Sequence, residues 1–206
     1  FPLLLESLER VTYRGYDSFG VAVLNGKGIE MYKQVGAVDG VRGEVTFPGT
    51  AGIGHTRWAT IGGVSQRNAH PHFDCEEQVA IVHNGDIDNF QALRTRLIDE
   101  GHTIRSETDS ELIAHLIETY RQDDLIQALE RAVSDLEGSY AIVALDYLTR
   151  VFQFTERREL VSTPGQIEPR SDAFQAEAVQ LSAIVAALQQ TDIAASGKRV
   201  FLDLKY

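Results

Sequence analysis

Predicted strands and helices come in separate runs along this 206-residue chain, and that order limits the folds that are possible. An amphipathic helix at residues 3–11 leads into a strand at 21–24, which the tight turn Asn25-Gly26 joins to a strand at 29–35. Strict alternation of strands and helices would indicate a parallel sheet, whereas runs of each favour an α+β fold. We therefore expect mostly antiparallel sheets with helices packed on the outside.

The remaining predicted elements continue this pattern over one domain, which we expect to span residues 1–206. Further strands are predicted at 51–55, 79–82, 140–145, 151–155 and 199–204. Further helices are predicted at 88–100, at 125–136 and at 176–190. Another helix is predicted to begin after a cap at Thr108 or Asp109. Residues 36–50 and 156–171 are predicted to be loops, because both contain glycine and proline among polar residues.

The charge balance and the cysteine content narrow the class of protein. Thirty acidic side chains against 19 basic ones give a formal net charge of −11, which disfavours nucleic acid and anionic membranes as partners. No apolar run approaches the roughly 20 residues of a membrane-spanning helix. Cys75 is the only cysteine, so no disulfide can form within the chain, and a reducing cytoplasm is the expected location.

Two polar motifs next to predicted strands carry candidate binding chemistry. In Gly54–Thr60, Arg57 and Thr60 are suited to hold a carboxylate, because the arginine fork binds carboxylates through two hydrogen bonds. Asn84-Gly85 lies between a short apolar strand and a helix, so its side-chain amide and backbone N–H are suited to form an oxyanion hole. The alternatives stay open, because a lone arginine is usually an exposed ion-pair residue and Asn-Gly is a common tight-turn dipeptide.

Asp109 and a group of residues around Cys75 are weaker candidates. Asp109 either caps a helix or accepts a hydrogen bond from the ammonium group of a substrate, and both interpretations are open. The group of His70–His72, Asp74 and Cys75 fits no established spacing of zinc ligands. Acidic neighbours also raise the pKa of the Cys75 thiol, which argues against a reactive thiolate. The sequence therefore predicts no metal, no cofactor and no nucleophile at this group.

Five motifs occur in an order and at separations that resemble one known family. They are Tyr13–Ser18, Gly54–Thr60, Asn68–His72, Val82–Gly85 and Ser106–Asp109. They resemble the glutaminase domain of glutamine–fructose-6-phosphate aminotransferases, which are class II glutamine amidotransferases of the N-terminal-nucleophile hydrolase type. The resemblance covers residues 1–145 and is poor beyond them. It implies a four-layer αββα sandwich of two mostly antiparallel sheets.

The resemblance also implies an activity and partners. The implied reaction is hydrolysis of L-glutamine to glutamate and ammonia, with the ammonia passed to sugar-phosphate isomerase domains that make glucosamine 6-phosphate. These domains are expected on the same chain or complex, in a cytoplasmic homo-oligomer. The implied residue roles are substrate binding for Arg57, Trp58, Thr60 and Asp109, an oxyanion hole from Asn84 and Gly85, and support of the nucleophile by Arg14.

Departures from the family pattern bear on function. The family's nucleophile is a cysteine at the N-terminus, yet this sequence begins at Phe1, so we expect the first strand and the nucleophile to lie outside it. Ile61 stands where the family often has histidine, and residues 156–198 lack the family's usual segment. Two alternatives remain. One is a non-catalytic glutamine-binding or regulatory module without a nucleophile, and the other is the glutaminase domain of an amidotransferase of purine or glutamate synthesis.

Overall fold

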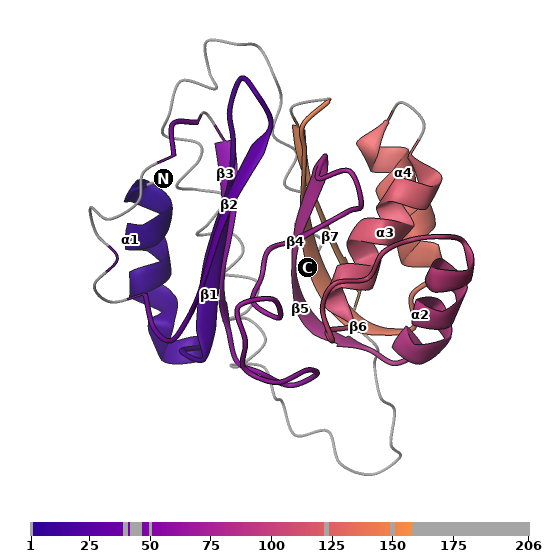
Figure 1. Cartoon of the computed structure of the whole chain (residues 1–206), viewed down its shortest axis with the longest axis horizontal. Helices are drawn as coiled ribbons and strands as arrows, with labels where there is room; N and C mark the ends of the chain where they lie inside the picture. The colour runs from indigo at the N-terminus through magenta and orange to yellow at the C-terminus, as the bar shows by residue number, and fades with distance from the viewer. Residues whose placement is uncertain are drawn as a thin grey trace.

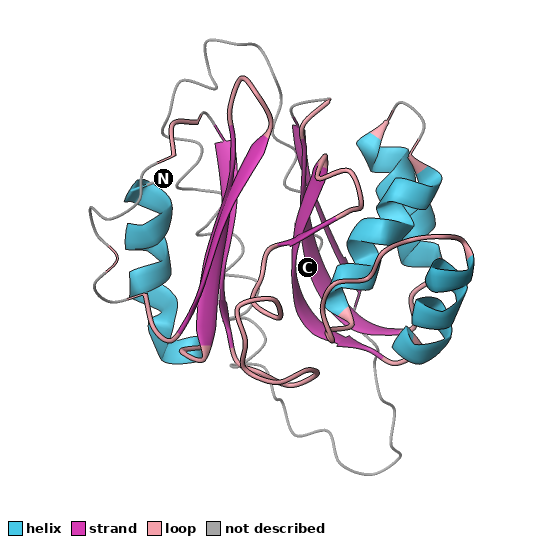
Figure 2. Ribbon diagram, in the orientation of Figure 1, coloured by secondary structure: helices cyan, strands magenta, loops and turns pink. Residues whose placement is uncertain are grey.

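The computed structural model describes residues 2–38, 41, 47–49, 51–121, 124–148 and 151–157. Two antiparallel sheets lie face to face, with helix α1 (Pro2–Val11) outside one sheet and three helices outside the other (Figure 1, Figure 2). These three helices are α2 (Phe90–Asp99), α3 (Ser110–Tyr120) and α4 (Leu125–Ser134). The predicted α+β fold, a four-layer αββα sandwich, is therefore confirmed.

The first sheet has the strand order β2-β1-β3, with both pairings antiparallel. Its strands are β1 (Ser18–Leu24), β2 (Ile29–Val35) and β3 (Ala51–Arg57). The prediction of β1 at 21–24 was too short, because Ser18 already pairs with Val35 on one side and Arg57 on the other. Every residue of β1 is buried, and Ser18 and Gly20, which have no apolar side chain, belong to the strand because of the strands that pair with them.

Helix α1 covers the outer face of the first sheet. Leu4 and Leu8, one helical turn apart, lie in a buried cluster with Phe19 of β1, as the amphipathic pattern predicts. The helix passes into a short 3-10 turn, η1 (Thr12–Arg14). The motif Tyr13–Ser18 therefore begins within η1 and ends at the first residue of β1.

The second sheet has the strand order β4-β5-β6-β7, and all of its pairings are antiparallel. Its strands are β4 (His72–Phe73), β5 (Val79–Ile87), β6 (Gly138–Asp146) and β7 (Val151–Arg157). The sequence predicted β5 only as far as residue 82, but β6 pairs with it continuously from Val79 to Ile87. The two-residue strand β4 was not predicted at all. Its Phe73 pairs with Ala80 of β5.

The space between the sheets changes from apolar to polar along the strands. Ala22 and Ile53 of the first sheet share a buried cluster with Val82 of the second. Alternate residues of a strand face the same side. His55 therefore faces the space between the sheets, as Ile53 does, and Asn84 faces it, as Val82 does. The polar end of this inner layer is where the candidate site lies.

Several predicted boundaries shift by a few residues for local reasons. Helix α2 begins at Phe90 rather than at 88, and the backbone N–H of Asp88 donates to the carbonyl oxygen of Glu137 at the end of the β5–β6 pairing. The predicted elements at 176–190 and 199–204 and most of both predicted loops lie outside the described residues, so the assignment of one domain to 1–206 stays a prediction.

Among the described residues, no helix has the length and apolar character to cross a membrane.

Candidate active site

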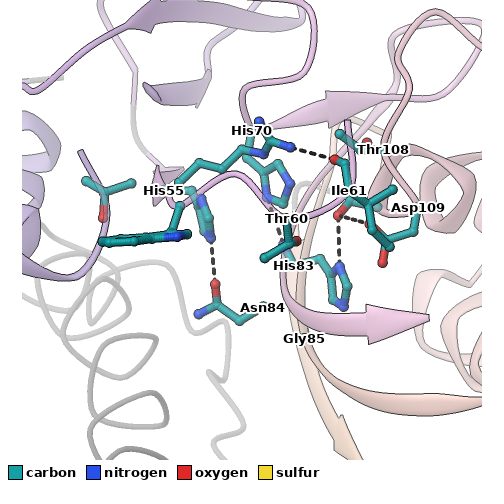
Figure 3. A pocket seen from close by; sticks show the side chains of 13 residues that line it. His55, Thr60, Ile61, His70, His83, Asn84, Gly85, Thr108 and Asp109 are labelled. Carbon is teal, nitrogen blue, oxygen red and sulfur yellow. Dashed lines mark hydrogen bonds between the residues drawn. The ribbon is translucent and has the colours of Figure 1, made fainter. Parts of the chain in front are cut away.

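A cavity of about 150 Å³ opens at the polar end of the inner layer (Figure 3). Its walls come from the end of β3 and the loop after it, from β5, from the start of α3 and from His70. Six of the residues predicted as site residues line this one cavity: Arg57, Trp58, Thr60, Asn84, Gly85 and Asp109. Residues that lie up to 52 positions apart in the sequence thus share one site, and this convergence is a product of the fold.

Arg57 is the last residue of β3, not a residue of the following loop as the sequence suggested. Its guanidinium is buried and donates to the carbonyl oxygens of Ile61 at 2.6 Å and Gly62 at 3.1 Å. Burial lowers the pKa of Arg57, and the nearby carboxylate of Asp109 partly offsets that effect. Within the described part of the chain, no carboxylate lies within ion-pair distance of this guanidinium. A buried cation of this kind favours an anionic ligand in the cavity.

The loop after β3 forms the rim of the cavity. The side chain of Trp58 is 56% exposed and its ring meets the ring of Tyr16 edge-on, with 5.3 Å between centroids. The backbone N–H of Ala59 donates to the carboxylate of Asp17 at 2.9 Å, which ties this loop to the start of β1. Thr60 is exposed and lies beside Ile61 at the cavity (Figure 3). The rim therefore has an aromatic ring and a hydroxyl group available to a ligand.

Asn84 and Gly85 lie within β5, which corrects the expectation that they form a loop between a strand and a helix. They pair with Ala141 and Tyr140 of β6. Gly85 has a φ of +123°, and a Cβ atom there would lie 2.0 Å from the carbonyl oxygen of Ser139. Only glycine fits this position, so the Asn-Gly pair marks a distortion of the strand rather than a hairpin turn.

His55 is a pocket residue that the sequence interpretation did not single out. Its Nε2 atom lies 2.6 Å from the Oδ1 atom of Asn84 (Figure 3). An amide oxygen only accepts, so Nε2 carries the proton and donates. Burial lowers the pKa of His55 to about 4, so the ring is neutral near pH 7. The bond turns the amide NH₂ of Asn84 away from His55 and leaves it as a donor for a ligand. The available signal was strand alternation, which puts His55 on the same face as Arg57.

Three further buried histidines extend from His55 as a polar layer. The ring of His55 stacks on that of His70 at 4.3 Å, and His70 meets His72 edge-on at 4.8 Å. His70 accepts a hydrogen bond from the backbone N–H of His83, whose ring lies 2.8 Å from the hydroxyl of Ser110. Burial lowers the pKa of all three additional rings. The layer is therefore uncharged near pH 7, and the positive charge at the cavity resides on arginine.

The structure separates these histidines from the residues near them in sequence. Asp74 accepts hydrogen bonds from the backbone N–H groups of Gln78 at 2.7 Å and Val79 at 3.0 Å, which closes the turn between β4 and β5. Cys75 lies beside other histidines, outside the cavity. The group around Cys75 that the sequence suggested as a possible cluster therefore does not form as such.

Asp109 occupies the N-cap position of α3, yet its side chain makes no capping hydrogen bond. Its carboxylate instead accepts from the backbone N–H of Ile87 at 3.0 Å and from the hydroxyl of Ser110 at 3.2 Å. Burial raises its pKa, and these hydrogen bonds act in the opposite direction. The hydroxyl of Thr108 accepts from the N–H of Glu111 at 3.4 Å. The capping contact thus comes from Thr108, and the Asp109 carboxylate lines the cavity.

Arg14 is the remaining predicted site residue. Its backbone ends η1, whereas its side chain lies outside the described part of the structure. Its predicted role near the nucleophile stays a prediction.

Sequence comparison connects this geometry to known proteins. Residues 55–161 match the glutamine amidotransferase domain family. The glutamine–fructose-6-phosphate aminotransferase (isomerizing) of Acidithiobacillus ferridurans is 50% identical over 150 residues, which cover 70% of this chain and 24% of that protein. The enzyme of the same name from Thermotoga maritima is 45% identical over 146 residues, 69% of this chain and 24% of that protein. The chain spans about a quarter of the length of these relatives.

Solved structures share the fold. The glutamine phosphoribosylpyrophosphate amidotransferase from B. subtilis, complexed with ADP and GMP, has a TM-score of 0.61 and 24% identity, covering 71% of this chain and 32% of that chain. A structure described as the allosteric regulatory enzyme of purine biosynthesis has a TM-score of 0.62 and 26% identity, covering 70% and 32%. The family match extends over about half of the chain and includes all of the residues that line the cavity. The chain belongs to the glutamine amidotransferase domain family.

Proposed function

We propose that this chain is the glutaminase part of a glutamine–fructose-6-phosphate aminotransferase. It would hydrolyse L-glutamine to glutamate and ammonia, and deliver the ammonia to sugar-phosphate domains that make glucosamine 6-phosphate. The observation that carries the proposal is the presence in one cavity of a buried guanidinium, a buried carboxylate and a strand segment that bears an amide. These groups match the carboxylate, the ammonium and the side-chain amide of glutamine.

The binding step rests on charge complementarity. Arg57, whose guanidinium has no ion-pair partner among the described residues, would hold the glutamine carboxylate, with Thr60 and Trp58 at the rim. Asp109 would accept a hydrogen bond from the ammonium group. Each charge is buried, and a buried charge is costly unless it is paired. A free amino acid supplies both partners at once, whereas a glutamine inside a peptide supplies neither.

The chemical step would use an N-terminal cysteine of the whole protein, as the family resemblance implies. Its α-amino group, with a pKa near 8, can take the thiol proton close to neutral pH. The thiolate would attack the side-chain amide carbon of glutamine, and the resulting oxyanion would accept from the Asn84 amide and the Gly85 N–H. The amide nitrogen would leave as ammonia after taking a proton. Water would then cleave the thioester to release glutamate and the thiol.

The ammonia acceptor is supported by sequence similarity. The relatives at 45% and 50% identity are named for fructose 6-phosphate, whereas the structure named for phosphoribosylpyrophosphate is 24% identical. This contrast favours the sugar-phosphate branch over the purine branch. The acceptor domains would lie in the roughly three quarters of the relatives' length that this chain does not span. A homo-oligomeric state and a cytoplasmic location stay predictions.

Ammonia release from L-glutamine by the whole protein tests the proposal. Replacement of Asn84 by alanine is expected to lower kcat by about 10²–10³-fold, because one oxyanion donor is lost. Asn25→Ala, in the turn between β1 and β2, is the matched control and should keep the wild-type rate. The N-terminal residue of the mature protein, read by intact mass, separates the alternatives. Cysteine supports the enzyme, and any other residue together with glutamine binding supports the non-catalytic module.

A further inference from the structure

Four side chains with metal-ligating atoms converge on the helix side of the second sheet, apart from the glutamine cavity. Cys75 follows β4, His102 lies between α2 and α3, and His115 and Glu118 lie one turn apart on α3. Their ligand atoms all lie within 4.8 Å of one another. The proposed glutaminase reaction uses none of the four.

Four of the six distances between these atoms are close to the edges of a tetrahedron around a zinc-sized ion. With Zn–S near 2.3 Å and Zn–N near 2.0–2.1 Å, a tetrahedral site places sulfur and nitrogen ligands about 3.5 Å apart. The Sγ atom of Cys75 lies 3.6 Å from Nδ1 of His102 and 3.5 Å from Nδ1 of His115. The Oε2 atom of Glu118 lies 2.9 Å and 3.2 Å from the same two nitrogens. An ion at the centre therefore requires only small shifts.

The protons around His102 leave a lone pair directed at the centre of the cluster. The hydroxyl of Thr119 donates its proton to the carbonyl oxygen of His115 at 3.0 Å. It must therefore accept from Nε2 of His102, which is 2.9 Å away. In the neutral tautomer with the proton on Nε2, the lone pair of His102 Nδ1 faces the Glu118 carboxylate and the Cys75 sulfur. A metal ion between these atoms would accept all three lone pairs.

Two backbone N–H groups also form hydrogen bonds with these candidate ligand atoms. The N–H of Thr103 points to the Sγ atom of Cys75 at 3.5 Å, and the N–H of Cys75 donates to Oε2 of Glu118 at 3.1 Å. Outer hydrogen bonds of this kind orient ligands at metal sites. The His115 side chain is 1% exposed and that of Glu118 is 21% exposed, so the site is anchored inside and open to entry from outside.

We propose that Cys75, His102, His115 and Glu118 bind one Zn²⁺ ion. A thiolate with two imidazoles selects a borderline-soft transition metal over Mg²⁺ or Ca²⁺, which prefer oxygen ligands. Four protein ligands leave no position for a substrate, so the ion is structural. It joins the turn after β4, the segment between α2 and α3, and α3 itself. Asp109 precedes His115 by six positions, about 9 Å along the helix, so the ion also fixes the element that carries Asp109.

The sequence predicted no metal because it grouped Cys75 with its neighbours at 70–74. The four converging residues are spread over 44 positions, from Cys75 to Glu118, and only the last two share a helix. No short spacing pattern relates them, so only the fold reveals the cluster.

Titration of the metal-free whole protein with Co²⁺ tests the site, because tetrahedral Co²⁺ bound to a thiolate has a characteristic absorption. We expect one equivalent to bind with a sulfur-to-cobalt charge-transfer band, and Zn²⁺ to remove the band. Cys75→Ser should abolish the band, and Glu118→Gln should weaken binding at least about tenfold. Glu76→Gln is the matched control, since Glu76 is an exposed carboxylate next to Cys75 and should bind like the wild type.

Alkylation of Cys75, followed by mass spectrometry of its peptide, gives a readout that needs neither activity nor a folded cysteine variant. Zn²⁺ should slow the labelling of the wild-type thiol at least about tenfold, and Glu118→Gln should remove most of that protection. A cobalt band that persists in Cys75→Ser, or labelling that Zn²⁺ does not slow, would overturn the proposal and leave a hydrogen-bonded cluster. Loss of glutaminase activity with metal binding intact would instead contradict the proposed function alone.

Discussion

The Nε2 atom of His55 lies 2.6 Å from the Oδ1 atom of Asn84, and this hydrogen bond joins the two sheets at the cavity. His55 comes from β3 in the first sheet, and Asn84 comes from β5 in the second. Because the neutral ring donates to the amide oxygen, the bond fixes which end of the Asn84 amide faces a ligand. The relative position of the two sheets therefore controls the donor that we assign to the oxyanion hole.

His55→Leu removes the donor that orients Asn84 and replaces it with an apolar side chain of similar bulk. We expect kcat for ammonia release to fall at least about tenfold with little change in KM, because the lost interaction matters most in the transition state. In an Asn84→Ala background the same change should have little further effect on kcat. Steady-state kinetics of the two single variants and the double variant measure this coupling, and fully additive effects would contradict it.

Asp109→Asn removes a negative charge from the cavity but keeps an oxygen that can accept from the N–H of Ile87. We expect the KM for glutamine to rise at least about tenfold, since the ammonium group loses its charged partner. The free energy of unfolding should change little, because the capping contact belongs to Thr108. Glutamine kinetics measure the change in KM, and urea unfolding measures the change in the free energy of unfolding. Unchanged KM with lower stability would make Asp109 a structural residue.

Arg57→Ala is expected to raise the KM for glutamine by more than about tenfold, because the carboxylate loses a bidentate partner. The rate at which a small neutral reagent alkylates the catalytic thiol should stay within about twofold, since that reagent carries no carboxylate. Arg57→Lys should recover only part of the affinity, because an ammonium lacks the planar fork. If glutamine affinity and thiol reactivity fell together, Arg57 would be supporting the loop at 61–63 rather than the substrate.

Gly85→Ala should destabilise the fold by about 2–4 kcal/mol, because the residue combines a φ of +123° with a Cβ position 2.0 Å from the Ser139 carbonyl oxygen. Gly28→Ala is the matched control, since a Cβ there meets nothing within 4 Å. Urea unfolding of both variants measures the difference. Equal stabilities would show that β5 relaxes around the added methyl group.

Stability should fall as the pH drops from about 6.5 toward 4. Burial lowers the pKa of His83 to about 4 from 6.5, so in this window the unfolded chain binds a proton that the folded chain does not. Each such histidine costs up to about 1.4 kcal/mol per pH unit, and His55 acts in the same direction. His83→Asn, which can keep a hydrogen bond to Ser110, should flatten the pH dependence of unfolding measured by urea titration. An unchanged slope would show that His83 is protonated in the folded protein.

The sequence by itself determined the class of fold and most of the cavity. Two local signals are the helical periodicity at Leu4 and Leu8 and the turn at Asn25-Gly26. Each of them predicted an element that the structure contains. The motifs around Arg57, Asn84 and Asp109 identified residues that share one cavity. Local chemistry was sufficient there, because each motif combines a strand or helix end with a polar group of defined binding chemistry.

Only the tertiary structure decided what depends on pairing across the chain. Strand β5 continues through Asn84 and Gly85 because β6 pairs with it, and no local preference of Asn-Gly could show that. The neutral state of His55 and its bond to Asn84 require burial between two sheets. The cluster of Cys75, His102, His115 and Glu118 requires the packing of α3 against β4. Sequence patterns report what one segment prefers, whereas burial and long-range contact depend on which segments the fold brings together.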